Sequence, residues 1–492
     1  MTASPDDLPL QLRVALVAAG FTYDGVAEVL GAQAHDALAR NETTPGLRRT
    51  RGGSAVETLA RMFLLQTPVE LAAAERALPG LLDRMAARGL VEQSVGEVAA
   101  RLDVRPYAAG DEAGEHALWV VSDLTPGLDG GPQRVGSDHV LGISPASTSL
   151  AQLTIRETVG RSLDLGSGCG VQALHLARHS AEVVATDVNR RALWMTAFNA
   201  ALNEVGDSVD VREGSFFEPV ADEKFDLIAT NPPFVISPAT GARLVYRDSG
   251  LPGDRVVEHI VRAAPAHLSE GGWCQILANW VIARDRPWAD RLAPWVADGC
   301  DALVVQREVV DPPTYVELWL KDAGQHGAPD YVARYDTWLS WFEEQGIEAV
   351  GFGWVNLRKR AEGAGTRDFL DWPYDVEQPI APAIHEWGVA VDARVDLGSR
   401  LVARPDVQQE TLGPVGVEDP AVVVLRQQRG FRRARQADTV EAALVGACDG
   451  ELTVGQIIDA LAEILDLDAD ASRATYLPAV RELVAEGFLA PA

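Results

Sequence analysis

Apolar and polar residues alternate along the chain in a way that separates strand candidates from helix candidates. Short apolar runs predict buried strands at 161–165, 182–186 and 225–230. Segments at 171–178 and 255–268 carry an apolar residue every three or four positions and predict helices. Strands that alternate with helices are typical of an α/β domain with a parallel sheet.

Helical periodicity dominates both ends of the chain. Near the N-terminus we expect helices at 8–19, 54–65 and 78–88. Gly89 suits the C-cap of the last of these, and Thr453 suits the N-cap of a helix at 454–465. A helix–turn–helix pattern followed by a strand predicts a winged-helix-like module at each end, with two unrelated helical bundles as the alternative. Winged helices bind DNA, RNA or protein.

The composition indicates a globular protein of several domains. The chain has 492 residues, of which 47% are hydrophobic, so two to four domains are expected. No apolar run is long enough to predict a membrane span, and the acidic first residues lack the order of a signal peptide. The 4 cysteines and 9 histidines show no disulfide or metal-ligand spacing, so we expect reduced thiols, a cytoplasmic location and no metal.

A glycine-rich loop follows the first strand candidate. The loop reads Gly166-Ser167-Gly168-Cys169-Gly170. A strand, a glycine loop and a helix in this order place backbone N–H groups and a helix N-terminus against a ligand. Asp164 lies just before the loop, and Asp187 ends the next strand, where an acidic residue can bind a ribose diol. We interpret Cys169 as a small packing residue and not as a nucleophile.

A proline-rich segment, Asn231-Pro232-Pro233-Phe234, directly follows the strand candidate 225–230. Its two prolines fix the backbone φ angle and remove two N–H donors, so the local carbonyl groups remain acceptors. The Asn231 amide adds another acceptor, and the Phe234 ring adds a flat face. Together they can hold a planar NH2 group by two hydrogen bonds and one stacking contact. A structural turn is the alternative.

The ordered set of Asp164, the glycine loop, Asp187 and Asn-Pro-Pro-Phe resembles the class I methyltransferases that depend on S-adenosylmethionine (SAM). Over about residues 142 to 279 the chain looks like the amino-methylating group with an Asn-Pro-Pro-aromatic motif. That group includes the glutamine methyltransferases of peptide release factors (HemK type), N6-adenine methyltransferases and ribosomal RNA guanine-N2 methyltransferases. The resemblance implies a Rossmann-like α/β core with seven strands, SAM as the cofactor and a nitrogen atom as the methyl acceptor.

The resemblance also implies a role for each motif residue. The cofactor-binding set is Asp164, Gly166, Ser167, Gly168, Gly170, Asp187, Ser215, Phe216 and Asn231. In this family Asp164 and the loop would hold the methionine portion of SAM, and Asp187 would bind the ribose hydroxyls. Ser215 stands where an acidic residue near the adenine is common, which leaves that contact to Phe216.

The catalytic set implied in the same way is Asn231, Pro232, Pro233 and Phe234. The Asn231 side chain and the Pro232 carbonyl would accept hydrogen bonds from the target NH2, and Phe234 would stack on it. An amide or exocyclic amine nitrogen is a poor nucleophile because its lone pair is delocalised. Acceptors that hold its hydrogens can rotate the lone pair towards the methyl group, so positioning carries most of the rate and no strong base is required.

The implied methyltransferase domain occupies residues 126–358. A helical, winged-helix-like domain is expected at 1–125, and an α+β region that ends in a winged-helix-like module at 359–492. A class I sheet needs two more strands after the fifth, the last of them antiparallel. The candidates after residue 300 are strands at 302–310, 315–321 and 347–357, helices at 330–345 and 379–392, and a loop at 359–375.

The methyl acceptor is expected to be a macromolecule of the translation machinery. A base of ribosomal or transfer RNA is the leading prediction, because flanking modules suit a large folded substrate. Two basic clusters could contact phosphates. They are Arg358, Lys359, Arg360 and Arg367, and Arg426, Arg429, Arg432, Arg433 and Arg435.

A glutamine side chain of a protein is the alternative acceptor. The chain has 43 basic and 71 acidic residues and a net charge of −28, which opposes binding to nucleic acid outside a local basic patch. The block 250–253 resembles a Gly-Leu-x-Gly segment of the HemK type, and the segment 142–148 loosely resembles that family's proline-containing segment ahead of the glycine loop. A small molecule or a peptide is a further alternative.

Overall fold

The structure is a computed structural model of the chain and describes residues 7–111, 114–131, 136, 138–233, 235–238, 251–325, 327–415 and 421–492. The chain divides into two compact units. The first comprises residues 1–151 and 156–371, and the second comprises residues 152–155 and 372–492. Each unit contains a hydrophobic core of its own.

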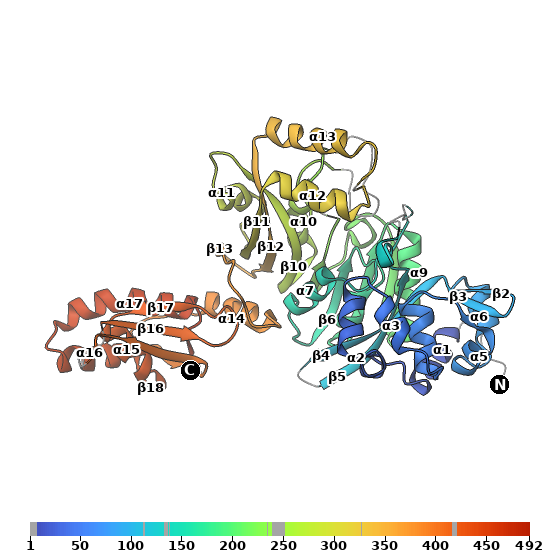
Figure 1. Cartoon of the computed structure of the whole chain (residues 1–492). Helices are drawn as coiled ribbons and strands as arrows, with labels where there is room; N and C mark the ends of the chain where they lie inside the picture. The colour runs from blue at the N-terminus through green and yellow to red at the C-terminus, as the bar shows by residue number, and fades with distance from the viewer. Residues whose placement is uncertain are drawn as a thin grey trace. The chain divides into compact units, whose positions relative to one another are not determined.

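The first unit is built on an eight-stranded sheet in the order β13-β11-β12-β10-β9-β6-β7-β8 (Figure 1). Its strands are β6 (Val159–Leu165), β7 (Ser180–Asp187), β8 (Val209–Glu213), β9 (Phe225–Thr230), β10 (Leu268–Ala283), β11 (Cys300–Val310), β12 (Ile347–Lys359) and β13 (Arg367–Asp371). The strands from β6 to β10 pair in parallel, whereas β12 lies antiparallel between β10 and β11. This is the class I α/β core that the motifs predicted, with β13 as an additional strand.

The strands after residue 300 are now assigned. β11 and β12 complete the core and confirm the strands predicted at 302–310 and 347–357. The strand predicted at 315–321 is wrong, because this segment lies in helix α12 (Pro312–Asp322). Asp311 starts that helix by accepting a hydrogen bond from the Thr314 N–H group at 2.8 Å, and a proline occupies its first turn.

The loop predicted at 359–375 also needs correction. It contains β13, which pairs in parallel with β11 from Ala302–Arg367 to Gln306–Asp371. The sheet therefore continues beyond residue 358, where the sequence analysis placed the end of this domain.

Helices join the strands of the sheet. They are α7 (Pro145–Leu153), α8 (Val171–Leu176), α9 (Arg190–Leu202), α10 (Arg255–Ala263), α11 (Trp288–Leu292), α12 and α13 (Tyr331–Glu344). The pair α12 and α13 connects β11 to β12 and packs against β12, as Figure 1 shows in yellow and orange. The helices predicted at 171–178 and 330–345 are confirmed, and the one predicted at 255–268 ends as a 3₁₀ turn, Ala264–His267.

Residues before the sheet form a helical region and a long hairpin. Its elements are α1 (Leu8–Ala18), α2 (Tyr23–Ala39), α3 (Thr44–Arg49), α4 (Ala55–Leu59) with a π-helical turn at Ala60–Leu64, β1 (Val69–Glu70), α5 (Leu71–Ala77), α6 (Leu82–Ala87), β2 (Val91–Ser94), β3 (Glu97–Ala100), β4 (Leu102–Asp111) and β5 (Gly114–Asp123). Helices predicted at 8–19 and 54–65 are confirmed. The helix predicted at 78–88 begins only at Leu82, because Leu78 ends α5.

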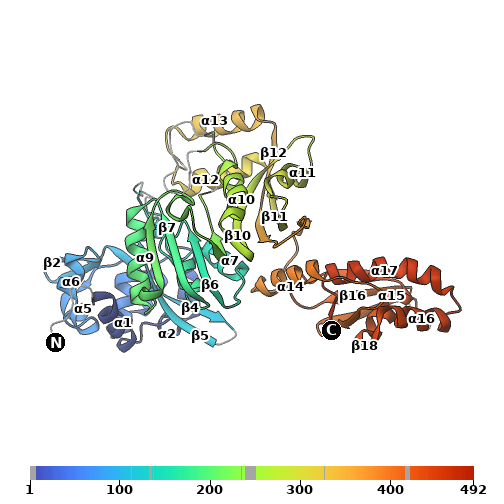
Figure 2. The same ribbon diagram turned by 180° about the vertical axis from the view of Figure 1, so that it is seen from behind.

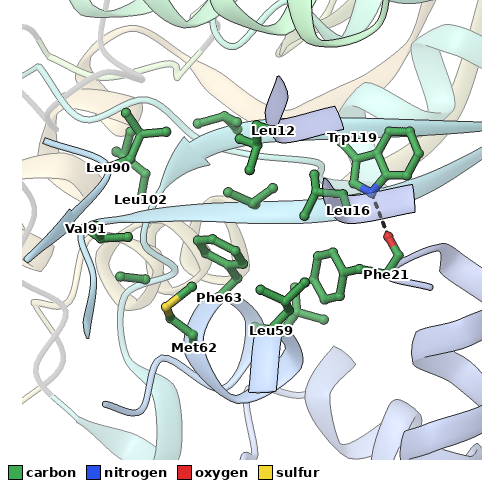
Figure 3. Packing of buried hydrophobic residues seen from close by; sticks show 14 of the residues in the cluster. Leu12, Leu16, Phe21, Leu59, Met62, Phe63, Leu90, Val91, Leu102 and Trp119 are labelled. Atoms are coloured by element: carbon green, nitrogen blue, oxygen red, sulfur yellow. Dashed lines mark hydrogen bonds between the residues drawn. The ribbon is translucent and has the colours of Figure 1, made fainter. Parts of the chain in front are cut away.

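Large apolar side chains hold this N-terminal region together. Phe21, Phe63 and Leu16 are fully buried in one cluster, and the Trp119 indole N–H donates a hydrogen bond to the Phe21 carbonyl at 2.7 Å (Figure 3). Within the described residues no single helix is long and apolar enough to cross a membrane, although the bent pair of α1 and α2 meets that length and composition together.

Asn199 of α9 and Asn203, the residue that caps the C-terminus of this helix, join the N-terminal hairpin to the large sheet. Asn199 accepts a hydrogen bond from the Val121 N–H group at 2.8 Å and donates one to the Val121 carbonyl at 2.8 Å. Asn203 pairs with both backbone groups of Trp119 in the same manner. These amides act as a substitute strand along β5, whose buried backbone groups need partners. Figure 2 shows α9 between the N-terminal helices and the sheet, in agreement with its contacts to α1, β5 and β7.

The second unit contains two small antiparallel sheets, β18-β14-β19 and β15-β16-β17. Its elements are α14 (Ala381–Asp392), β14 (Arg400–Ala403), β15 (Val407–Leu412), β16 (Val422–Gln427), β17 (Ala434–Ala437), α15 (Thr439–Ala447), β18 (Asp449–Thr453), α16 (Val454–Ile464), α17 (Ala469–Ala485) and β19 (Leu489–Pro491). Helices predicted at 379–392 and 454–465 are confirmed. Thr453 caps α16 as predicted, in a reciprocal capping box with Gln456.

Asn199→Ala is expected to destabilise the first unit by about 3 kcal/mol, because it leaves buried backbone groups of Val121 without partners. The measurement is the thermal unfolding midpoint and the free energy of unfolding in urea. Gln93→Ala is the control, since its amide bonds to Asp83 at an exposed position, and it should shift stability by less than about 0.5 kcal/mol. Equal effects of the two variants would contradict the role of Asn199.

Candidate functional site

The carboxyl ends of neighbouring parallel strands meet at one edge of the sheet. Leu165, the last residue of β6, pairs with Thr186 of β7 and with Thr230 of β9. The Thr230 hydroxyl also donates a hydrogen bond to the Leu165 carbonyl at 2.7 Å. The glycine loop, Asp187 and Asn231 each follow one of these strand ends, so the fold brings the predicted site residues together.

The glycine loop adopts backbone conformations that favour glycine. Gly166, Gly168 and Gly170 have φ angles of 80°, 56° and 82°. A Cβ atom on Gly170 would lie 3.0 Å from the Thr196 side chain, so the start of α8 packs closely on α9. By contrast, no neighbouring heavy atom lies within 4 Å of a Cβ built on Gly166 or Gly168. The loop therefore presents an open surface at these two positions.

The sequence analysis predicted that the loop's backbone N–H groups face a ligand, but several of them donate hydrogen bonds within the protein. Those of Gly166 and Ser167 donate to the Thr186 carbonyl, and that of Gly168 donates to the Asp187 carboxylate at 2.9 Å. The Gly170 N–H group donates to the Ser167 carbonyl. Parallel pairing with β7 brings these acceptors close enough to bind the amides. The loop thus contributes shape and nearby carboxylates more than free donors.

The two predicted carboxylates lie beside the loop with different surroundings. Asp164 is buried and accepts a hydrogen bond from the Ala173 N–H group at 2.9 Å. Burial, with Asp187 nearby, raises the pKa of Asp164 to about 7. Asp187 accepts hydrogen bonds from the Gly168 and Asn189 N–H groups, and burial also raises its pKa. A carboxylate offers about four acceptor sites, so Asp187 retains capacity for a ligand hydroxyl.

Two further loop residues have structural partners. The Thr196 hydroxyl lies within hydrogen-bonding distance of the Ser167 hydroxyl, at 3.1 Å, and of the Gly168 carbonyl, at 3.0 Å. Burial raises the pKa of the Cys169 thiol to about 12, so it stays protonated and agrees with the packing role expected for it. Neither Thr196 nor Asn199, which donates to the Cys169 carbonyl at 2.8 Å, was anticipated. Both lie on α9, and no sequence motif marks them.

Ser215 and Phe216 follow β8 at the same edge. The Ser215 carbonyl accepts a hydrogen bond from the Glu218 N–H group at 3.0 Å. Phe216 has a φ angle of 47°, and its ring packs edge-on against His259 of α10 with centroids 4.7 Å apart. An adenine contact by either residue stays a prediction.

The residues Asn231-Pro232-Pro233-Phe234, named the proline corner from here on, include a hydrogen-bond acceptor that no described residue uses. The Asn231 Oδ1 atom is buried and has no hydrogen-bond partner among the described residues. Pro232 is buried and Pro233 is exposed. Phe234 lies outside the described residues, as do residues 239–250 of the following block, so its stacking role stays a prediction. An orphaned buried acceptor is rare and calls for a partner, which a bound NH2 group would supply.

The chain after the corner is held by residues that the sequence analysis assigned no role. The Ile236 N–H group donates a hydrogen bond to the Tyr315 hydroxyl at 2.8 Å, and the Asn279 amide donates to the same hydroxyl at 3.0 Å. Tyr315 belongs to the segment that was predicted as a strand, so its contact with the chain after the corner was not predicted. The buried Asn279 Oδ1 atom is also without a partner in the described part of the chain.

The segment 142–148 approaches the loop from the other side. Ser144 and Ser147 exchange hydrogen bonds at the start of α7, and the Ser147 carbonyl accepts one from the Gln172 amide at 2.7 Å. Gln172 lies in α8, directly after the glycine loop. This hydrogen bond places the segment beside α8, the helix that follows the glycine loop.

Residues 142–286 match the family model described as "Methyltransferase small domain". The match confirms that the region with the motifs is a domain of the SAM-dependent methyltransferase type. Residues 18–101 and 385–491 match two models that are each described only as a "Domain of unknown function".

Bacterial relatives share the same region. The chain is 36% identical over 132 residues to a "Release factor glutamine methyltransferase" of Xylella fastidiosa, covering 24% of this chain and 47% of that protein. It is 36% identical over 125 residues to a "Ribosomal protein uL3 glutamine methyltransferase" of Bradyrhizobium diazoefficiens, covering 23% and 39%. A release factor glutamine methyltransferase of Cereibacter sphaeroides is 32% identical over 186 residues, covering 36% and 62%. The chain thus spans less than two thirds of the length of these relatives.

The pKa of Asp164 predicts how stability depends on pH. Because the folded-state pKa, about 7, exceeds the ordinary value of 3.8, the proton stabilises the fold below pH 3.8, and this contribution is lost as the pH rises to about 7. Asp164→Asn should therefore gain about 2–3 kcal/mol relative to the wild type between pH 5 and pH 8. Unfolding of the ligand-free proteins in urea at both pH values measures this gain, and a constant difference would contradict the raised pKa.

Proposed function

We propose that this protein transfers the methyl group of SAM to the side-chain amide nitrogen of a glutamine in a protein of the translation machinery. The observation that carries the proposal is the buried Asn231 Oδ1 atom, which has no hydrogen-bond partner among the described residues. Asn231 directly follows Thr230, which pairs with Leu165 just before the glycine loop. A single acceptor could also bind a hydroxyl or thiol, but two neighbouring acceptors, Asn231 Oδ1 and the Pro232 carbonyl, match the two hydrogens of an NH2 group.

The residues beside the loop fit SAM. Its sulfonium and ammonium groups are cationic, and the nearby groups are the carboxylates Asp164 and Asp187. Gly166 and Gly168 leave space above the loop. Asp187 accepts backbone hydrogen bonds from Gly168 and Asn189 and would use its remaining acceptor capacity for the ribose hydroxyls. When bound, SAM supplies an activated methyl group.

The chain's own residues then orient the acceptor. Asn231 Oδ1 and the Pro232 carbonyl would accept the two hydrogens of the amide NH2, which turns the NH2 group about the C–N bond and takes the nitrogen lone pair out of conjugation with the carbonyl. The nitrogen loses its proton only after it has gained the methyl group and a positive charge, so water can accept that proton. Fixed dipoles that favour the developing charge and the aligned geometry supply the rate.

A protein acceptor has more support than the RNA base that led the sequence predictions. The relatives reported above are named for glutamine methylation of a release factor or of ribosomal protein uL3. Both acceptors would use the same NH2 clamp, so the choice depends on the surface that surrounds it.

Five of the nine basic residues in the two clusters form ion pairs with carboxylates, which lowers the charge available to phosphates. Arg358 and Arg360 pair with the buried carboxylate of Asp301, and Arg367 pairs with Asp298. In the second unit Arg426 pairs with Glu410, and Arg435 pairs with three glutamates, Glu441, Glu482 and Glu486. Charges neutralised within the protein release few counterions on binding nucleic acid.

The N-terminal region also favours a protein partner over a nucleic acid. Residues 54–100 run as a helix, a short strand, two helices and a hairpin, with the sheet order β1-β3-β2, and we assign them to a winged-helix-like module. Its hairpin tip exposes Glu92, Gln93, Ser94, Val95 and Glu97, with no basic side chain among them. A tip of this composition favours contact with a protein over contact with phosphates.

Mass spectrometry of a strain that lacks this protein tests the proposed acceptor. Methylated glutamine should disappear from a release factor or from ribosomal protein uL3 and return when the gene is restored. Nucleosides from bulk RNA of the same cultures serve as the comparison. Loss of a methylated base with all methylglutamine retained would reject the protein acceptor and support RNA.

Asp187→Ala should weaken SAM and S-adenosylhomocysteine binding by at least about tenfold, because it removes a charge-assisted hydrogen bond to the ribose. Isothermal titration calorimetry measures this affinity. Asp210→Ala is the matched control, since Asp210 lies on β8, is exposed and pairs with Arg212 at 2.7 Å. Unchanged affinity in Asp187→Ala would contradict the assigned role.

Asn231→Ala should reduce methyl transfer by at least about 100-fold, a loss typical when one positioned hydrogen-bonding group is removed from an active site. S-adenosylhomocysteine affinity should stay at the wild-type level, because the cofactor contacts lie on the loop and Asp187. Transfer is followed with radiolabelled SAM and the acceptor that mass spectrometry identifies. Full turnover by this variant would show that the NH2 clamp is wrong.

A further inference from the structure

Tyr315 lies directly behind the proline corner, although it comes from a distant part of the chain. It belongs to α12, in the connection between β11 and β12, and is completely buried. This connection lies outside residues 142–286, which match the methyltransferase model. The corner is therefore supported by a part of this chain that the matched domain does not include.

The Tyr315 hydroxyl gathers hydrogen bonds from two elements. The Ile236 N–H group donates to it at 2.8 Å, and the Asn279 amide of β10 donates to it at 3.0 Å. Ile236 is buried and follows Asn231 by only a few residues. The hydroxyl thus ties the chain just after the corner to the adjacent strand of the sheet.

Aromatic side chains prevent the Tyr315 ring from moving. Its centroid lies 6.0 Å from that of Trp319, 5.9 Å from that of Phe342 and 5.8 Å from that of Phe352. Val235 and Ile236 pack in the same cluster. A ring held on several sides places its hydroxyl at one point, so the Ile236 N–H group has a fixed partner.

The corner is consequently braced at both ends. Before it, the Thr230 hydroxyl donates to the Leu165 carbonyl at 2.7 Å. After it, the Ile236 N–H group donates to the Tyr315 hydroxyl. The Asn231 Oδ1 atom, which has no partner among the described residues, lies between these two anchors in the chain. An acceptor without a partner of its own is held in place only by the backbone that carries it.

We propose that Tyr315 is a positioning residue for methyl transfer, because its hydroxyl holds the backbone that carries the Asn231 and Pro232 acceptors. This inference rests on the proposed function of the corner. Tyr315 does not touch the reacting atoms and forms no bond to the substrate. Its effect is to keep the two acceptors at the separation that an NH2 group requires.

Tyr315→Phe tests the proposal, because it removes one oxygen atom and keeps the ring. The turnover number for methyl transfer should fall by about 100-fold, as expected when the acceptors shift by about 1 Å. S-adenosylhomocysteine affinity and the KM for SAM should not change. A purely structural role would instead lower stability and leave the turnover number of the folded enzyme intact.

Tyr335→Phe is the matched control. Tyr335 borders the same aromatic cluster, but its hydroxyl donates to the exposed Glu317 carboxylate at 2.9 Å and not to a described residue of the corner. This variant should keep the wild-type turnover number. Equal losses in both variants, or full turnover by Tyr315→Phe, would overturn the proposal.

Hydrogen exchange at the Ile236 amide separates this proposal from the proposed function. Mass spectrometry with fragmentation should find this amide protected in the wild type and in Tyr335→Phe, and exchanging at least about tenfold faster in Tyr315→Phe, since its acceptor is gone. The measurement needs no methyl acceptor, so it holds even if transfer to glutamine is not found. Rapid exchange in the wild type, or protection that survives in Tyr315→Phe, would show that the anchor does not exist.

Discussion

The in-register parallel pairing of β6 with β7 and β9 at Leu165 is the constraint on which the site depends. It places the ends of three strands at one edge, and the Thr230–Leu165 hydrogen bond closes that edge. A slip of one residue in either pair would turn Asp164 or Thr230 to the opposite face of the sheet. Because the glycine loop, Asp187 and Asn231 follow these ends directly, their closeness is a consequence of register.

The amide of Asn199 links this edge to the N-terminal hairpin. It bonds to both backbone groups of Val121 and to the Cys169 carbonyl of the glycine loop. One buried side chain thus satisfies groups from the loop and from a region that matches no methyltransferase model. Val121 of the hairpin and Cys169 of the loop share this side chain as a hydrogen-bond partner, which links the N-terminal region to the predicted cofactor site through α9.

Ion pairs within the fold explain part of the charge pattern of this chain. A net charge of −28 coexists with clusters of arginine that suggest a phosphate track when only the sequence is considered. In the fold, the fully buried Asp301 carboxylate pairs with Arg358 and Arg360. Arg435 pairs with Glu441, Glu482 and Glu486. Arg358 and Arg360 stabilise the Asp301 carboxylate, which would otherwise be costly to bury. Their role in the fold leaves the glutamine acceptor as the better supported proposal.

The strand, the glycine loop and the proline corner could be predicted from the amino-acid sequence, because they depend on residues close together in the chain. The glycines at 166, 168 and 170, the prolines after Asn231 and the buried run 225–230 identify a strand, a loop and a corner, because backbone restrictions act within a few residues. Parallel strands then require the corner and the loop to share an edge, and the structure agrees.

Features that depend on residues far apart in the chain could not be predicted from the sequence and became visible in the fold. The segment 315–321 carries aromatic and branched residues that favour a strand, yet the Asp311 cap and the packing against β12 make it a helix. That change places Tyr315 against Ile236, a contact between residues far apart in the chain. The pairing of the arginines and the amide bonds of Asn199 have the same origin: the partners are brought together by the fold, and no spacing in the sequence records them.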